Sequence, residues 1–326
     1  MLICYTKSIP RIIGILSVVL MVCQQLWFNQ KTALFNNDNS FSPPIVNDVG
    51  TSSSFAGLHR AMMGLFESIP ISNQQPEMKP TTLKNLICRL DAHDNRDIVL
   101  ATHITTSKFQ ALLTQLKYWK GPASIAVYIK TKEDIDSFFR FIGQNQPLLK
   151  TVTFHLVMEK TDMPYPHNIL RNVAVEAVES GHIVILLDVD LIPMPEGCHD
   201  RLLAALKSPS SELFVNKKKM FVLPAFQIKQ IEGNTHASED QLPLSKGELI
   251  EKLKTKEVVP FHLKEFELGH GPTNFTKWIN LPSSNDTTFY DIPNNSRVKN
   301  GSFEPYVIAS RFGLPKYWYV RFSNAF

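Results

Sequence analysis

The amino-acid sequence predicts an α/β domain with a mostly parallel central sheet, preceded by an N-terminal transmembrane helix. From about Thr81 onward, short apolar runs of strand length alternate with amphipathic segments of helix length, which is typical of α/β proteins. Upstream, nineteen uncharged residues lie between Arg11 and Lys31. Of the 326 residues, 44% are hydrophobic and 20% are charged, which excludes collagen-like, wholly disordered and multi-span membrane proteins. The net charge of +4 includes one basic run, Lys217–Lys219, which is typical of a solvated loop, so no nucleic-acid partner is expected.

Residues 12–28 are mostly aliphatic and predict a helix that crosses a bilayer. At about 1.5 Å per residue, nineteen helical residues span about 28 Å, close to the thickness of a hydrocarbon core. Lys7 and Arg11 precede the run, so the positive-inside rule places the N-terminus in the cytosol. A cleaved signal peptide is the alternative, but the run is long for one and no small-x-small cleavage site follows Phe28. We therefore expect a cytosolic tail at 1–11, a signal anchor at 12–28 and a lumenal remainder.

Residues 29–80 are rich in Asn, Ser, Gln and Pro and predict a stem, with one short amphipathic stretch from Leu58 to Ile71. Cys88 and Cys198 are the cysteines beyond the anchor, and the sequence leaves open whether they pair. Four N-glycosylation triplets agree with a lumenal domain. They begin at Asn274, Asn285, Asn294 and Asn300.

The domain expected at 81–326 opens with strands and helices in alternation. Apolar runs bounded by polar residues predict strands at 97–101, 123–129, 152–158 and 182–188. Helical spacing of apolar residues predicts helices at 107–119, 131–142 and 168–180. Thr131 and Asp134 have the spacing of a capping box at the start of the second helix. The fourth strand is apolar throughout, so we expect both of its faces to be covered, and ligands to bind beyond the carboxyl ends of the strands.

Asp188 and Asp190 directly follow that fourth strand. Because residues i and i+2 of an extended segment point to the same side, both carboxylates are expected to face one point. Paired carboxylates suit Mg²⁺ or Mn²⁺, which complete their coordination with substrate phosphate oxygens. Two solvated carboxylates at a strand end are the alternative. The position at the expected ligand edge favours metal-assisted departure of a nucleotide diphosphate.

Several sequence blocks occur in a fixed order over residues 95–322. They are Trp119–Tyr128, Tyr165–Ala174, Leu187–Pro195, Phe221–Phe226, Gly269–Trp278 and Phe303–Val307. In this order the chain resembles the glycosyltransferase family of LARGE and β-1,4-glucuronyltransferase 1, nucleotide-sugar transferases of the GT-A type. The resemblance implies a GT-A-like, Rossmann-like nucleotide-sugar domain, a UDP-sugar donor, a glycan acceptor on a glycoprotein and a place in protein O-linked mannosylation. It also implies a single-pass type II protein of the Golgi membrane, with a partner glycosyltransferase as a further option.

The resemblance also implies roles for single residues. Asp188, Asp190 and His270 would bind Mn²⁺ (or Mg²⁺); Thr102, His103, Arg171, Asn172 and Asp188 would face the donor; Trp278, Glu304 and Tyr306 would face the acceptor. The alternatives are a plain loop at Thr102 and His103, a surface pair at Arg171 and Asn172, a structural His270, and core packing for Trp278 and Tyr306.

The chain departs from the family pattern after Phe303–Val307. The family continues with a Pro-x-Tyr-Asp-x-Arg-Phe segment and a Gly-x-Gly-Trp-Asn-Lys segment, whereas this chain has Trp318 in place of the acid and ends at Phe326. The catalytic base is therefore unassigned, with Glu304 and Glu267 as the first candidates. We expect a C-terminally incomplete domain that moves glucuronic acid from UDP-glucuronate onto a xylose-bearing or related glycan. Transfer of another UDP-sugar and an inactive lumenal binding partner are the alternatives, and the activity of this chain stays open.

Overall fold

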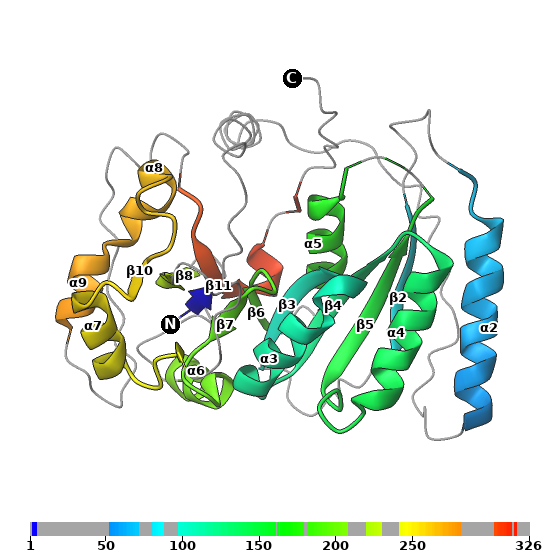
Figure 1. Cartoon of the computed structure of the whole chain (residues 1–326), viewed down its shortest axis with the longest axis horizontal. Helices are drawn as coiled ribbons and strands as arrows, with labels where there is room; N and C mark the ends of the chain where they lie inside the picture. The colour runs from blue at the N-terminus through cyan, green and yellow to red at the C-terminus, as the bar shows by residue number, and fades with distance from the viewer. Residues whose placement is uncertain are drawn as a thin grey trace.

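A seven-stranded sheet and a smaller four-stranded sheet organise the part of the chain that the structure describes (Figure 1). The computed structural model describes residues 2–4, 52–71, 80–87, 97–160, 162, 164–178, 182–207, 220–229, 241–281, 303–314 and 316–317. The strands are β1 (Leu2–Cys4), β2 (Thr81–Ile87), β3 (Ile98–Thr105), β4 (Ala123–Ile129), β5 (Val152–Met158), β6 (Ile183–Leu186), β7 (Leu191–Pro193), β8 (Met220–Leu223), β9 (Ala225–Ile228), β10 (Val258–Pro260) and β11 (Tyr306–Ser310). The large sheet has the order β2-β5-β4-β3-β6-β11-β8, and the small one has the order β10-β9-β1-β7.

The helices surround these sheets. They are α2 (Ser52–Ser68), α3 (Phe109–Trp119), α4 (Lys132–Gln144), α5 (His167–Glu176), α6 (Cys198–Lys207), α7 (Lys246–Lys254), α8 (Glu267–His270) and α9 (Phe275–Asn280). The short 3-10 helices among the described residues are η3 (Thr106–Lys108), η5 (Gly271–Thr273) and η6 (Arg311–Gly313). The expected capping box is confirmed: the Thr131 side chain accepts from the Asp134 backbone N–H, and the Asp134 carboxylate accepts from the Thr131 backbone N–H.

The predicted α/β class with a mostly parallel central sheet is confirmed. β5, β4, β3 and β6 are parallel neighbours, and the strands expected at 123–129 and 152–158 coincide with β4 and β5. The strands expected at 97–101 and 182–188 differ at their ends, because β3 continues to Thr105 and β6 already ends at Leu186. The antiparallel strands β2, β11 and β8 extend the sheet on both sides and were not predicted.

The order of the parallel strands decides which face each helix covers. The chain moves from β3 to β4 to β5 in one direction and then returns across the sheet to β6. Since parallel crossovers are right-handed, the returning helix must lie on the opposite face. Accordingly, Leu112 of α3 and Phe138 of α4 belong to the same buried core as Leu100 of β3, whereas Leu170 of α5 belongs to a second core together with Val99. Between β3 and β6 the chain changes direction, and such a switch point is where open α/β sheets bind ligands.

Part of the expected stem belongs to the folded unit. We expected residues 29–80 to precede the domain, but α2 packs along α4 at the end of the molecule farthest from α7 and α9 (Figure 1). Met62 and Phe66 are buried, and the Phe55 ring meets the Phe139 ring edge-on at 5.1 Å. The His59 Nε2 atom lies 2.7 Å from the Asp136 Oδ1 atom. The apolar face of this helix is buried against α4, because an amphipathic helix must cover its apolar face.

The N-terminal strand β1 is at odds with the expected cytosolic tail at 1–11. It pairs with β7 on one side and β9 on the other. Because β1 is hydrogen-bonded to β7 and β9, it must lie on the same side of any membrane as the domain. This pairing is therefore incompatible with a cytosolic tail on a lumenal domain. The predicted span at 12–28 lies outside the described residues. Within the described part of the chain, we find no helix that combines the length and the apolar character needed to cross a bilayer.

Candidate functional site

The site lies where β3 and β6 end, at the switch point of the large sheet. Asp188 follows β6 by two residues, and His103 lies near the end of β3. Helix α5 begins at the same edge, because it follows the parallel strand β5, and it contributes Arg171. Residues from three segments therefore converge at the edge where an α/β sheet is expected to bind a ligand.

The Asp188–Leu191 segment is a turn, so the predicted extended geometry of the aspartate pair is wrong. The Leu191 N–H donates to the Asp188 carbonyl at 3.0 Å. The buried Gln115 amide of α3 holds the same turn, because its Nε2 donates to the Asp188 carbonyl at 3.0 Å and to the Leu191 carbonyl at 2.8 Å. Sequence reasoning missed Gln115. The available signal was a polar residue at a core-facing position beside Leu112 and Leu116.

Asp188 lies among cationic and polar groups. Its Oδ1 accepts from an Arg171 guanidinium nitrogen at 3.3 Å, and the His103 Nε2 atom lies 3.8 Å away. The Tyr306 hydroxyl lies 3.5 Å from Oδ2. Burial raises the pKa of Asp188, but the charge and the hydrogen bond of Arg171 oppose this shift, and the net pKa lies below its ordinary value. Asp188 is therefore ionised at neutral pH, and we call these four residues the Asp188 cluster.

Asp190 has a different partner. The Lys108 ammonium, at the end of η3, donates to Asp190 Oδ1 and Oδ2, both at 2.9 Å. The Asp190 side chain is 37% exposed and the Lys108 side chain 42%, so water reaches the ion pair. Asp188 is thus paired with a cation on α5, and Asp190 is paired with a cation at the start of α3, on the opposite side of the site. Sequence reasoning did not identify Lys108.

His103 presents a neutral imidazole to the site. Its Nδ1 atom lies 2.9 Å from the Tyr165 hydroxyl, and its buried Nε2 has no hydrogen-bond partner. Burial lowers the pKa of His103 to about 3, although Asp188 opposes the shift. The neighbouring Thr102 is fully buried in β3, and its hydroxyl also has no hydrogen-bond partner. His103 thus lies beside Asp188, and its donor-side role stays a prediction, whereas Thr102 faces the interior.

Asn172 is not free to take the donor-side role that we expected. Its Nδ2 donates to the Tyr317 carbonyl, and its Oδ1 accepts from the Tyr317 N–H, both at 2.7 Å. The Tyr317 ring lies over the Arg171 guanidinium, with 5.6 Å between the Cζ atom and the ring centroid. Asn172 therefore holds a C-terminal segment against α5, and that segment covers one side of Arg171.

The expected acceptor-side residues separate into two groups. Tyr306 belongs to the Asp188 cluster, and Glu304 lies near it. Burial raises the pKa of Glu304, Arg171 opposes the shift, and Asp188 adds to it. Trp278 instead packs against Phe226, with the ring centroids 5.2 Å apart, beside a separate apolar core. For Trp278 the structure therefore favours core packing, the alternative that the sequence left open.

His270 lies in an aromatic environment on α8. Its ring is 5.3 Å from the Phe261 ring and 6.3 Å from the His262 ring. Burial, with a smaller contribution from His262, lowers the pKa of His270 to about 4, so its imidazole is neutral. Glu267 opens the same short helix and is exposed.

The donor chemistry of this edge fits a hard divalent cation. Asp188 and Asp190 supply carboxylate oxygens, and the unpartnered Nε2 of His103 lies 3.8 Å from an Asp188 oxygen. The arrangement is nevertheless closed, because Asp190 is paired with Lys108 and Asp188 with Arg171. Among the described residues, no three His, Cys, Asp or Glu side chains are gathered in a way that could hold a metal ion, and metal binding by Asp188, Asp190 and His270 stays a prediction.

The glycosylation and cysteine predictions fall mostly outside the described residues. Asn274 is the one predicted acceptor within them, where it is the N-cap of α9 and its Oδ1 accepts from the Lys277 N–H at 3.1 Å. Asn285, Asn294 and Asn300 lie outside. Cys198 is buried, and Cys88 lies outside the described residues, so the structure does not test their pairing.

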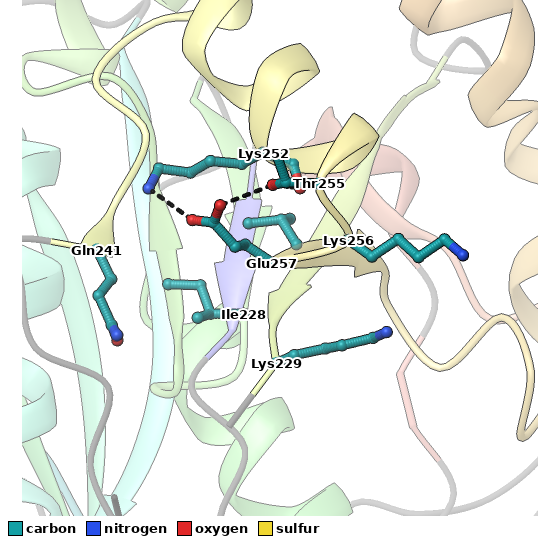
Figure 2. A pocket seen from close by; sticks show the side chains of 8 residues that line it. Ile228, Lys229, Gln241, Lys252, Thr255, Lys256 and Glu257 are labelled. Atoms are coloured by element: carbon teal, nitrogen blue, oxygen red, sulfur yellow. Dashed lines mark hydrogen bonds and ion pairs between the residues drawn. The ribbon is translucent and has the colours of Figure 1, made fainter. Parts of the chain in front are cut away.

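A cavity of about 310 Å³ lies between β9, β10 and α7 and includes no residue of the Asp188 cluster (Figure 2). In it, the Glu257 carboxylate accepts from the Lys252 ammonium at 3.4 Å and from the Thr255 hydroxyl at 2.7 Å. Lys229 and Gln241 also line it, and they flank residues 230–240, which lie outside the described part of the chain. We assign no ligand to this cavity.

Comparisons with known proteins match most of the described domain. The model of the family described as glycosyl-transferase for dystroglycan matches residues 97–164 and 158–318. The xylosyl- and glucuronyltransferase LARGE1 of Mus musculus is 31% identical over 226 residues, which cover 69% of this chain and 27% of that protein. The LARGE2s protein of Danio rerio, with the same description, is 32% identical over the same shares. A glycosyltransferase-like protein, gnt14 of Dictyostelium discoideum, is 30% identical over 56% of this chain and 27% of its own length.

These relatives are much longer than the matched region. The chain spans 27% of the length of the curated relatives named above. Among solved structures, a mannosyltransferase from Pyrobaculum calidifontis in complex with GDP-Man and Mn²⁺ is 15% identical, over 48% of this chain and 42% of that chain. Its TM-score of 0.24 is too low to bear on fold or function.

Proposed function

The chain belongs to the family of glycosyl-transferases for dystroglycan, and from this premise we propose that it transfers a sugar from a UDP-sugar to a glycan acceptor on a glycoprotein. We propose glucuronic acid as the sugar and a xylose-bearing or related glycan as the acceptor. The donor choice is supported by the family resemblance and by the names of the similar proteins, which carry both xylosyl and glucuronyl transfer. Xylose is therefore the second candidate donor sugar.

One observation carries the proposal: two aspartates at the switch point of a parallel sheet, each held by its own cation. A nucleotide diphosphate brings at least two negative charges, and such a site must neutralise them. Arg171 and Lys108 supply cationic groups at the same edge as Asp188 and Asp190. A bound Mn²⁺ or Mg²⁺ on these aspartates would supply Lewis-acid neutralisation of the leaving diphosphate.

The residues around Asp188 suit distinct roles in the transfer. The acceptor hydroxyl forms a bond to the anomeric carbon, the bond from that carbon to the diphosphate oxygen breaks, and a base takes the hydroxyl proton. Glu304 is the first candidate base, because its raised pKa brings a carboxylate closer to the operating pH. Arg171 faces Asp188 and is placed to bind phosphate or a uronate carboxylate by its planar donors.

A donor panel tests this proposal. Purified chain is incubated with UDP-glucuronate, UDP-xylose and UDP-N-acetylglucosamine, with and without Mn²⁺, and transfer to a xylose-bearing acceptor is measured. We expect Mn²⁺-dependent transfer from UDP-glucuronate. In Asp190→Asn, which keeps the side-chain shape but removes one anionic ligand, Mn²⁺-dependent UDP binding should weaken at least ~10-fold. Binding of UDP without turnover of any donor would support an inactive binding partner instead.

We also propose that the domain is lumenal and that residues 12–28 anchor it in the Golgi membrane as a type II protein. The apolar run and the preceding Lys7 and Arg11 support this placement. The proposal competes with the pairing of β1, which requires the N-terminus and the domain on one side. The two arrangements differ in whether an N-terminal epitope is cytosolic.

A further inference from the structure

The Lys108 ammonium occupies the side of the Asp190 carboxylate on which a metal cation would bind. The ammonium nitrogen is equally distant, 2.9 Å, from both Asp190 oxygens. A cation so placed lies near the bisector of the carboxylate, where a bidentate cation would otherwise sit. Both side chains remain more than one-third exposed, so the pair is able to open into water.

Helix stability does not account for a lysine at this position. Lys108 is the N-cap residue of α3, where its side chain makes no capping hydrogen bond, and the first turn of α3 contains no acidic residue. The N-terminus of a helix carries a partial positive charge, so a cation there is unfavourable. Asp190, 82 positions farther along the chain, compensates the unfavourable charge.

The pairing is fixed by the architecture on both sides. Lys108 and Gln115 are seven residues apart, about two helical turns, so both face the Asp188–Leu191 turn from one side of α3. Gln115 holds the backbone of that turn by two hydrogen bonds, while Lys108 holds the Asp190 side chain. One element therefore places both the carboxylate and the cation that neutralises it.

We propose that Lys108 is a built-in counter-cation that withholds Asp190 from a divalent cation until a nucleotide diphosphate is present. The inference rests on the proposed function, in which Asp190 is a metal ligand. Asp190 becomes available when its ion pair with Lys108 opens, and a diphosphate offers the released ammonium a new anionic partner. Lys108 thereby couples metal and nucleotide binding, and each must strengthen the other by the same factor.

Isothermal titration of the full chain tests this coupling. Affinities for Mn²⁺ and for UDP are measured separately and with the other ligand saturating, in wild type, Lys108→Met and Lys117→Met. The Lys117 control removes the same charge from the same helix. Since opening an exposed ion pair corresponds to at most about a fivefold change in affinity, Lys108→Met should bind Mn²⁺ alone more tightly by up to about fivefold. The factor by which UDP and Mn²⁺ strengthen each other's binding should fall by at least the same amount in Lys108→Met. Lys117→Met should stay within about twofold of wild type, and Lys108→Arg should keep the coupling.

The possible results separate the inference from the proposed function. If folded Lys108→Met binds Mn²⁺ alone no more tightly than wild type, the inference is wrong, although the glycosyltransferase proposal stands. Weaker UDP binding with an unchanged Mn²⁺ affinity would also overturn the inference and make Lys108 a plain phosphate ligand. Absence of Mn²⁺ binding to wild type even with UDP would overturn both the inference and the metal part of the proposed function. Should Lys108→Met not fold, Lys108→Gln, which also removes the charge, replaces it under the same criteria.

Discussion

Gln115 should stabilise the fold and the aspartate turn together, and Gln115→Met separates its amide from its bulk. Methionine keeps the length and lack of branching of glutamine, so the cavity stays filled. The substitution removes hydrogen bonds of 3.0 and 2.8 Å to the Asp188 and Leu191 carbonyls, each worth about 0.5–1.5 kcal/mol. It also removes the buried Oε1, which has no hydrogen-bond partner, and this offsets part of the loss. We expect the free energy of unfolding to fall by about 1–2 kcal/mol.

Urea denaturation followed by tryptophan fluorescence measures this loss, and UDP binding with Mn²⁺ reports on the turn. Gln110→Met is the matched control, because Gln110 is an exposed residue of the same helix and should change stability by less than about 0.5 kcal/mol. UDP affinity should fall in Gln115→Met but not in Gln110→Met, since only the buried amide positions the backbone next to Asp188 and Asp190. A Gln115→Met protein as stable as wild type would refute the reasoning, because the two hydrogen bonds would then contribute nothing net.

Two further predictions concern pH and topology. His199 is buried, with Nε2 2.7 Å from Asp97 Oδ1 and Nδ1 2.8 Å from Asp200 Oδ1, so both ring nitrogens face acceptors, which favours the protonated ring. Burial lowers the pKa of His199, but Asp97 and Asp200 raise it by more, so its stabilisation is complete below about pH 6.5 and is lost as pH rises through the folded-state pKa. At pH 5.5, wild type should be more stable than His199→Gln by about 1–2 kcal/mol, because Asp200 is 85% exposed and adds little. Urea denaturation should show that this difference in stability becomes smaller by pH 9. A difference that grows with pH would contradict the prediction. For topology, the proposed anchor predicts that protease added to sealed microsomes removes an N-terminal epitope but spares the domain, whereas protection of both would favour β1 within the sheet.

How much of the candidate site could be predicted depended on the range of the interactions involved. Asp188 and Asp190 were identified because an apolar strand followed by two carboxylates is a local pattern. Their geometry was not, since a turn held by Gln115 replaced the expected extended segment. Lys108 was missed for a similar reason: nothing next to it in the sequence indicates a partner 82 positions away.

The sequence by itself determined the parallel α/β core and the start of α4. Apolar periodicity encodes which residues must leave water, and a capping box is satisfied by residues three positions apart, so neither needs knowledge of distant contacts. Only the tertiary structure decided that Asn172 holds the backbone of Tyr317, 145 positions away, rather than facing a donor. Only the tertiary structure, too, showed that α2 packs on α4 instead of forming part of a stem. These contacts depend on which polar groups and apolar faces meet once the chain has folded. A buried amide can hydrogen-bond to many groups, and an apolar helix face can pack against many surfaces, and the sequence does not indicate which of them it will meet.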